Sequence, residues 1–219
     1  MSSGGYAAIF DLDGVLTSTS ARHERSWTDA AEQFGFPVTP ESLAETRSVP
    51  RASSLNALLA HAGVTLDEAT RNAVMAFKNQ RYRELIAGLT PADAFDGARE
   101  ALDACRRLNL RTAVASASLN AQQVLERLDL IGLVDFVADP RESAAKPSPE
   151  IYGRCCAALD VSPAAAICIE DGASMIANLR AEGLYTVGVG PAPLGADEQV
   201  ARIADWYVAG TVRTLKARS

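Results

Sequence analysis

The chain has 219 residues, of which 48% are hydrophobic and 22% are charged. These values are typical of globular proteins, so they exclude a wholly disordered chain, and the length suits one large domain or a domain with a modest insertion. The formal net charge of −6 argues against a nucleic-acid binder, and the two histidines exclude a histidine-rich metal site but not a carboxylate site.

Short apolar or β-branched runs alternate with helical patterns along the chain. Polar or turn residues follow each run, which favours strands over the alternative of buried helical segments. Strands alternating with helices predict an α/β fold, a doubly wound and mainly parallel sheet with a Rossmann-like core. The predicted strands are Tyr6–Phe10, Leu110–Ala115, Leu133–Ala138, Ala165–Ile169 and Leu184–Val189.

A long interval without a strand-like run follows the first strand and has helical periodicity. Ser53 or Ser54 can cap the start of one expected helix and Gly63 its end, and a second helix covers Asp67–Ile86 with Asp67 or Thr65 as its cap. We therefore expect a core made of residues 1–18 and 90–219 and an inserted helical domain at 19–89. The apolar stripe of the first helix is formed by Leu55, Leu58, Leu59 and Ala62.

Two aspartates, Asp11 and Asp13, follow the first strand in the sequence Asp-Leu-Asp-Gly. In an extended chain, residues two apart point to the same side, so both carboxylates can reach one pocket at the ligand-binding edge of the sheet. They would repel unless a cation lies between them, and Mg²⁺ is the hard cation that oxygen ligands favour. An aspartate beside Mg²⁺ can attack phosphorus while the second acts as acid and base. The alternative is a turn or cap role.

Three further signals follow later strands. Ser116-Ala117-Ser118 and Asn120 can hold phosphate oxygens or merely cap a helix. Lys146, before Pro147, can bridge phosphate and nucleophile or be a solvated loop lysine. Glu170-Asp171 closes an apolar strand and needs a counter-charge if buried, the alternative being helix-capping acids. Because all these signals occur at strand ends, one shared pocket is the stronger hypothesis.

The ordered set of motifs resembles the haloacid-dehalogenase-like phosphotransferase superfamily over essentially the whole chain. The matching segments are Asp11–Gly14, Ser116–Ser118, Lys146-Pro147 and Glu170-Asp171. The resemblance implies that residues 19–89 are a small cap domain and that Asp11 is the nucleophile and Asp13 the acid/base. It further implies phosphate binding by Ser116, Ala117, Asn120 and Lys146, and Mg²⁺ binding by Asp11, Asp13 through its backbone carbonyl, Glu170 and Asp171.

Within the superfamily the chain is most similar to the beta-phosphoglucomutase family. That family interconverts beta-glucose 1-phosphate and glucose 6-phosphate through a bisphosphate, which implies glucose 1,6-bisphosphate as an intermediate or activator here. Arg51 would grip the distal phosphate. The residues that resemble its cap and substrate loop, and are expected to bind substrate, are Thr19, His23, Trp27, Arg47, Arg51, Ser54 and Lys78.

Four positions depart from the pattern of the mutases. Arg47 and Ser48 stand where a lysine and a glycine are usual, Leu119 replaces a basic residue beside Asn120, and Met175 occupies a glycine position. Arginine and lysine differ in geometry, so the first pair bears on the choice of sugar. A sugar-phosphate phosphatase remains the alternative function, and a catalytically weak binding protein is a third hypothesis that the intact aspartates and Lys146 oppose.

Partners and location are also predicted. The four cysteines have no C-x-x-C spacing, which favours reduced thiols over a zinc site or a disulfide scaffold. No apolar run approaches the length of a membrane span, and the first residues lack the basic and apolar regions of a secretory signal. We expect a cytoplasmic monomer that acts on a small sugar phosphate and binds neither nucleic acid nor membrane.

Overall fold

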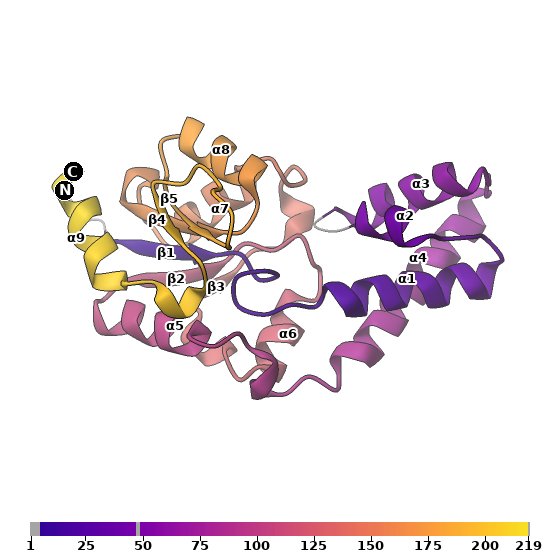
Figure 1. Cartoon of the computed structure of the whole chain (residues 1–219), viewed down its shortest axis with the longest axis horizontal. Coiled ribbons are helices and arrows are strands. Elements are labelled where there is room, and N and C mark those ends of the chain that lie inside the picture. The colour runs from indigo at the N-terminus through magenta and orange to yellow at the C-terminus, as the bar shows by residue number, and fades with distance from the viewer. Residues whose placement is uncertain (1–4, 47–48, 219) are drawn as a thin grey trace. The chain divides into compact units, whose positions relative to one another are not determined.

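The computed structural model describes residues 5–46 and 49–218, and in this part of the chain six parallel strands form one sheet in the order β3-β2-β1-β4-β5-β6 (Figure 1). The predicted parallel sheet is confirmed. The sixth strand was not predicted, because its Glu-Gln-Val sequence lacks an apolar run. The strands are β1 Ala7–Phe10, β2 Arg111–Val114, β3 Phe136–Val137, β4 Ala166–Glu170, β5 Tyr185–Val189 and β6 Glu198–Val200.

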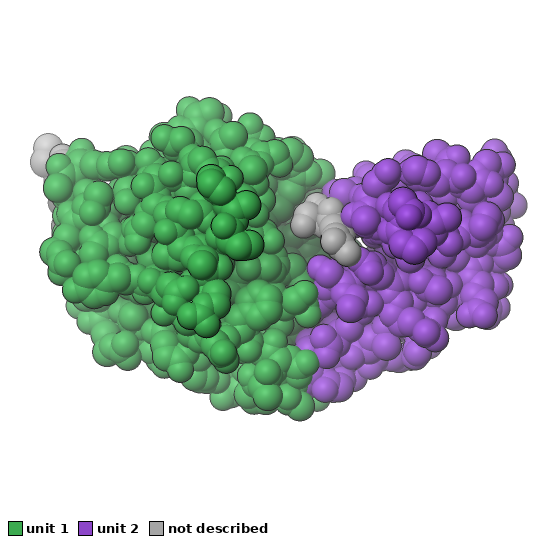
Figure 2. Space-filling view, viewed as in Figure 1, with its two compact units in different colours: residues 1–18, 90–219 green, residues 19–89 purple. Residues whose placement is uncertain are grey.

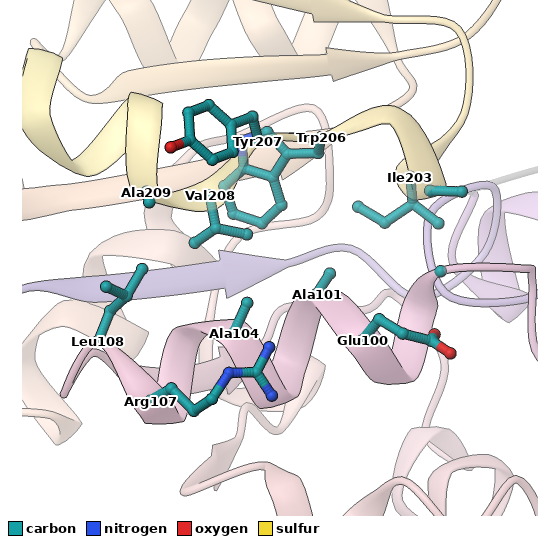
Figure 3. Close-up of a pocket in the computed structure, with 12 residues that line it drawn as sticks. Glu100, Ala101, Ala104, Arg107, Leu108, Ile203, Trp206, Tyr207, Val208 and Ala209 are labelled. Carbon is teal, nitrogen blue, oxygen red and sulfur yellow. The ribbon is translucent and has the colours of Figure 1, made fainter.

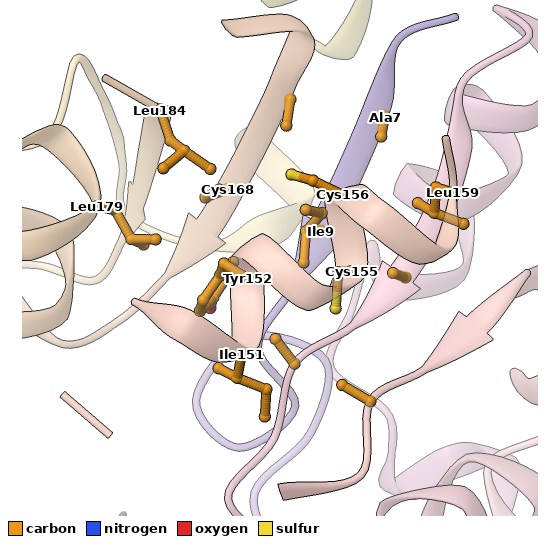
Figure 4. Close-up of a cluster of buried hydrophobic side chains, with 14 of the residues drawn as sticks. Ala7, Ile9, Ile151, Tyr152, Cys155, Cys156, Leu159, Cys168, Leu179 and Leu184 are labelled. Atoms are coloured by element: carbon orange, nitrogen blue, oxygen red, sulfur yellow. The ribbon is translucent and has the colours of Figure 1, made fainter. Parts of the chain in front are cut away.

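Helices cover both faces of this sheet, as expected for a doubly wound fold (Figure 1). Alternate residues of β1 point to opposite faces. Ile9 packs with helix α7 (Glu150–Ala158) and helix α8 (Ala173–Ala181) in one apolar cluster (Figure 4). Phe10 instead meets Trp206 edge to face at 5.9 Å between ring centroids. Because both faces of β1 are fully buried, this strand is a rigid base for the residue that follows it.

The remaining helices of the sheet-containing part are short. They are α5 Ala98–Arg107, α6 Ala121–Arg127 and α9 Val208–Arg218. Single 3₁₀ turns occur at Pro91–Asp93, Ile131–Leu133, Pro140–Glu142, Pro163–Ala165 and Ile203–Asp205. In the two described stretches, every helix is too short or too polar to be a candidate for a membrane span.

Internal contacts divide the chain into two compact units, Met1–Ser18 with Thr90–Ser219 and Thr19–Leu89 (Figure 2). The second unit is entirely helical where it is described. Its helices pack around a separate apolar core that contains Trp27, Leu55, Leu58 and Val74. Its elements are α1 Ser20–Phe34, α2 Pro40–Ala44, α3 Arg51–Ala62 and α4 Glu68–Ile86.

The ends of these helices test the predicted caps. Gly63 ends α3 with φ +64°, and the side chain of Asp67 caps α4 by accepting from the Thr70 N–H at 2.7 Å, as predicted. The expected start of α3 at Ser53 or Ser54 is wrong, because the helix begins at Arg51, directly after Pro50. Pro50 occupies the N-cap position with φ −56°, close to the value that its ring fixes, so the helix starts ahead of both serines.

Candidate active site

Asp11 lies at the carboxyl end of the central strand, directly beside Glu170. Phe10 pairs with Ile169 of β4, and the Asp11 N–H donates to the Ile169 carbonyl at 2.9 Å. The backbone ladder thus continues one residue beyond β1. Both carboxylates are nearly inaccessible, with Asp11 6% and Glu170 2% exposed. The sheet therefore fixes two buried acids side by side at its ligand-binding edge.

Lys146 joins these two acids from a loop that is distant in sequence. Its ammonium donates to Asp11 Oδ1 at 2.9 Å and to Glu170 Oε1 at 2.7 Å. The side chain of Lys146 is only 7% exposed, so water screens these ion pairs weakly. The structure thus brings together three of the residues that the strand-end pattern singled out.

Four donors among the described residues hold Glu170. Its Oε1 accepts from Lys146 and from the Tyr152 hydroxyl at 3.0 Å, and its Oε2 accepts from the backbone N–H groups of Asp171 at 3.0 Å and Gly172 at 3.1 Å. A carboxylate offers about four lone-pair positions. Glu170 is therefore saturated by protein donors, which favours an orienting role over direct ligation.

Asp171 turns the other way from Glu170 and approaches the turn after β1. Gly14 adopts φ +95°, and a Cβ built at Gly14 would lie 1.9 Å from Asp171 Oδ2. Only glycine permits both this conformation and this approach. The Gly14 N–H closes the turn by donating to the Thr17 carbonyl at 2.8 Å. Asp13 is half-buried, and its backbone forms an isolated parallel β-bridge with Thr17.

The electrostatics of the site follow from three acids around one ammonium. Burial is the largest cause that raises the pKa of Asp11, Lys146 opposes it, and Glu170 and Asp171 add to it. Burial alone would lower the pKa of Lys146, but Asp11 and Glu170 outweigh it and keep the ammonium charged. Burial and the charge of Glu170 raise the pKa of Asp171 to about 6. The three acids thus outnumber the one ammonium that can balance them, and Asp11 and Asp171 keep their protons to a higher pH than free carboxyl groups do.

This excess of carboxylates suits a divalent cation. One oxygen from each of Asp11, Glu170 and Asp171 lies within 4.8 Å of the others, close enough for a single ion. Carboxylate oxygens are hard ligands, and the chain supplies no histidine or cysteine to this group. The donor set thus fits a hard cation, with Asp11 and Asp171 better placed to ligate than the saturated Glu170.

The loop after β2 contains the residues predicted to hold phosphate. The Ala115 N–H donates to the Phe10 carbonyl at 2.8 Å, so Ser116 follows at the same sheet edge as Asp11. Ser116 is 3% exposed, and its Oγ accepts from the Ser118 N–H at 3.1 Å, while half-buried Ala117 lies between them. Asn120 precedes α6, which begins at Ala121, so Ser118 is not the cap of this helix.

Several predicted substrate residues cluster within the helical unit. Lys78, 3% exposed, donates to His23 Nδ1 at 2.8 Å and lies over the rings of Trp27 and Tyr82. Burial is the main cause that holds the pKa of His23 well below its usual value, and Lys78 and Arg51 add to it. His23 therefore stays neutral beside the lysine.

Other predicted substrate residues of this unit have structural partners. Thr19 Oγ1 lies 2.9 Å from the Tyr82 hydroxyl. Arg51 donates to Asn79 Oδ1 at 2.7 Å. Ser54 is 1% exposed and donates to the carbonyls that precede α3, so its hydroxyl faces backbone. Trp27 is a core residue, 2% exposed. Arg47, the remaining predicted substrate residue, lies outside the described residues, as does the neighbouring Ser48.

Tyr152 is the site residue that the sequence analysis missed. It lies in the first turn of α7, which begins at Glu150, and it sits among apolar residues (Figure 4). The available signal was its amphipathic character, because a buried tyrosine needs a partner for its hydroxyl. Burial raises the pKa of Tyr152 well above its usual value, so the hydroxyl stays a donor to Glu170.

At least two cavities open on the sheet-containing unit, each lined by residues that the structure describes. The larger, about 540 Å³, is lined by Gly14, Asp171, Phe95, Leu194 and Arg202 among others, so it borders the acidic cluster. The smaller, about 360 Å³, lies between α5 and the segment that enters α9 and has mainly apolar walls (Figure 3). None of the predicted site residues lines this second cavity, so it is separate from the cluster.

The chain is similar to known proteins over most of its length. A family model described as haloacid dehalogenase-like hydrolase matches residues 7–183. Beta-phosphoglucomutase of Bacillus subtilis strain 168 is 36% identical over 204 residues, which cover 91% of this chain and 90% of that protein. Hexitol phosphatase B of Escherichia coli K12 is 27% identical over 203 residues, which cover 91% and 89%.

A solved structure of a related protein also matches the fold of this chain. The crystal structure of beta-phosphoglucomutase from Clostridium difficile matches with a TM-score of 0.89 and 27% identity, and the match covers 98% of each chain. The family model spans most of the chain, and the curated relatives are matched over nearly their full length. The chain therefore belongs to the haloacid dehalogenase-like hydrolase family, among its sugar-phosphate mutases and phosphatases.

Proposed function

We propose that the chain is a Mg²⁺-dependent phosphomutase that converts beta-glucose 1-phosphate to glucose 6-phosphate through a phosphorylated Asp11. The observation that carries the proposal is the buried ion pair between Lys146 and Asp11 at the carboxyl end of β1, with Asp171 close by. The 36% identity to a beta-phosphoglucomutase supports the substrate. Such a site could hold an anionic phosphoryl group beside an anionic nucleophile, because the Lys146 ammonium and a bound Mg²⁺ would offset the repulsion between them.

The proposed reaction uses the chain's own carboxylates in two half-reactions. In the first, the 6-hydroxyl of beta-glucose 1-phosphate gives its proton to Asp13 and attacks the phosphoryl group of phosphorylated Asp11, which forms glucose 1,6-bisphosphate and frees the Asp11 carboxylate. In the second, an oxygen of Asp11 attacks the phosphorus on O1 of the bisphosphate, the bond between that phosphorus and O1 breaks, and Asp13 gives O1 a proton. Glucose 6-phosphate leaves, and Asp11 is phosphorylated again for the next turnover.

Other residues of the sheet-containing unit orient the phosphoryl group. Lys146 stays charged and places positive charge next to the attacking oxygen. Ser116, with the backbone of Ala117 and the amide of Asn120, would receive the phosphate oxygens at the end of β2. Bound Mg²⁺, held by Asp11, Asp171 and the Asp13 carbonyl, would offset the negative charge of the phosphoryl oxygens.

The helical unit would receive the sugar and its second phosphate. Arg51 and Lys78 supply cationic groups there, and the neutral His23 beside Lys78 can exchange hydrogen bonds with hydroxyl groups. A phosphomutase must keep water from the phosphorylated aspartate until a sugar hydroxyl arrives, and a cap that closes serves this purpose. The proposed substrate set also includes, on the basis of the sequence resemblance, Thr19, Trp27, Arg47 and Ser54.

The alternative is a sugar-phosphate phosphatase, in which water takes the phosphoryl group. The similarity to hexitol phosphatase B over 91% of the chain favours it as the second candidate. The carboxylates, Lys146 and Ser116 would serve both reactions in the same way. We also propose a reducing, cytoplasmic setting, which the four free and buried cysteines support.

The decisive experiment supplies beta-glucose 1-phosphate with Mg²⁺ and a trace of glucose 1,6-bisphosphate, and measures glucose 6-phosphate and free phosphate together. We expect glucose 6-phosphate to form without free phosphate. Free phosphate released in proportion to the substrate consumed would instead assign the phosphatase. A preparation with Asp11→Asn controls for contaminating enzymes, because it keeps the fold while lacking the proposed nucleophile.

Metal binding is expected to depend on pH. The raised pKa values of Asp11 and Asp171 mean that, without metal, the folded protein holds protons that the unfolded chain releases near pH 4. The stability of the metal-free protein should therefore fall as the pH rises through the pKa of about 6 of Asp171 and beyond. Mg²⁺ binds the ionised form, so the gain in Tm from Mg²⁺ over EDTA should be small near pH 5 and largest near pH 8. A gain that is constant across this range would contradict the metal site.

A further inference from the structure

Tyr152 combines full burial with a polar contact that packing does not require. The residue is 0% exposed and lies in the apolar cluster between α7 and the sheet (Figure 4). A phenylalanine ring would fill the same space. The hydroxyl, however, donates to Glu170 Oε1 at 3.0 Å. Because a buried hydroxyl without a partner costs free energy, this contact accounts for the presence of tyrosine here.

The same oxygen of Glu170 also accepts from Lys146. Lys146 Nζ lies 2.7 Å from Glu170 Oε1, 2.9 Å from Asp11 Oδ1 and 5.3 Å from the centre of the Tyr152 ring. Tyr152 therefore touches both members of the Lys146–Glu170 pair without reaching Asp11. Its hydroxyl supplies one of the hydrogen bonds that Glu170 Oε1 accepts, and its ring face restricts the position of the Lys146 ammonium.

The Lys146 ammonium donates to two carboxylates, and its distance from each decides how much of the negative charge of Asp11 it offsets. If the hydroxyl were absent, Lys146 would be the sole side-chain donor to Oε1, and Glu170 would attract it more strongly. The ammonium would then lean toward Glu170 and away from Asp11. Moving the ammonium away from the attacking oxygen of Asp11 should slow the reaction, because the transition state depends on a positive charge held at that place.

We propose that Tyr152 is a positioning residue for phosphoryl transfer, which acts through Glu170 to keep the Lys146 ammonium on Asp11. This inference rests on the proposed function, since it assumes that Asp11 carries the phosphoryl group. It assigns Tyr152 no contact with substrate. Removing the Tyr152 hydroxyl should therefore weaken the attachment of a phosphoryl group to Asp11. It should leave the binding of metal by the neighbouring carboxylates unchanged.

The test compares Tyr152→Phe with the wild-type protein, using beryllium fluoride with Mg²⁺ as a probe that mimics a phosphorylated aspartate without turnover. We expect Tyr152→Phe to bind beryllium fluoride about tenfold more weakly than the wild-type protein, as measured by ¹⁹F NMR. Its affinity for Mg²⁺, measured by calorimetry, should stay within about twofold of the wild-type value. Tyr185→Phe is the matched control, because Tyr185 is also buried at 5% and its ring packs with Arg218 instead. This control should bind both probes as the wild type does.

Two results would overturn the inference. Tyr152→Phe could bind beryllium fluoride as tightly as wild type, which would leave the hydroxyl without influence on Asp11. It could also lose Mg²⁺ and beryllium fluoride to the same degree, which would show a general loosening of the site. Failure of the wild-type protein itself to bind beryllium fluoride would count first against Asp11 as the phosphoryl acceptor, and thus against the proposed function on which this inference rests.

Discussion

Replacing Asp11 with asparagine is expected to lower kcat by at least about a thousandfold, which corresponds to about 4 kcal/mol of lost transition-state stabilisation. The amide matches the carboxylate in shape but has no charge and cannot form the acyl phosphate. Asp11 is buried beside Glu170 and Asp171, so the substitution also removes one of three mutually repelling acids. Steady-state kinetics and a search for phosphorylated protein after quenching would measure both consequences.

The same substitution should leave the fold intact and stabilise the metal-free protein at high pH. The neutral amide no longer carries the electrostatic cost that raises the pKa of Asp11. Asp160→Asn is a suitable control, because Asp160 is exposed and lies at φ +52°, a conformation that asparagine adopts readily. If Asp11→Asn kept activity within about tenfold of wild type, the covalent mechanism would be wrong.

The sheet was predictable from sequence because its central strands are buried on both faces. A strand covered on both sides shows as a continuous apolar run, as do Ala-Ala-Ile-Phe in β1 and Ala-Ile-Cys-Ile, the first four residues of β4. The strand β6 escaped prediction for the opposite reason. It is three residues long, lies at the sheet edge and has no fully buried residue, so it leaves no apolar signature.

The gathering of Asp11, Lys146, Glu170 and Asp171 at one edge of the sheet was predictable, but not how these side chains share their contacts. Glu170 and Asp171 are adjacent, and neighbouring residues at a strand end point in different directions. Nothing in the sequence indicated that Glu170 would face Lys146 while Asp171 would face Gly14. That choice depends on the register of β4 against β1, a long-range property. Tyr152 was missed for the same reason, because its partner is 18 residues away in sequence.

The helical unit shows the limit of inference from motif resemblance. The resemblance named His23 and Lys78 as substrate residues, and the structure places their side chains 2.8 Å apart. Lys78 lies over Trp27 and Tyr82 because α1 packs against α4. Apolar periodicity predicts each helix but not how the two helices are aligned with one another. Their role toward a substrate remains a proposal, because it depends on the chemistry of the ligand.

Replacing Lys146 with methionine is expected to damage both catalysis and stability. Methionine keeps the length of the side chain but removes the ammonium from Asp11 and Glu170, which are both almost fully buried. Removing one partner of a buried ion pair typically costs about 3–5 kcal/mol, and we expect a loss of this size near pH 8. We expect kcat to fall by at least about a hundredfold, because the phosphoryl group then meets an unshielded carboxylate. Urea unfolding and steady-state kinetics would measure the two effects.

The pH dependence separates this explanation from simple loss of packing. Without Lys146, the pKa of Asp11 should rise further, since the ammonium is the group that opposes its increase. The acids can then be neutralised by protons, so the stability lost in Lys146→Met should be clearly smaller near pH 5 than near pH 8, whereas a packing defect would cost the same at both. Lys216→Met, at an exposed lysine on α9, should stay within about 0.5 kcal/mol of wild type. An equal loss at both pH values would show that Lys146 serves the fold through its packing and not through its charge.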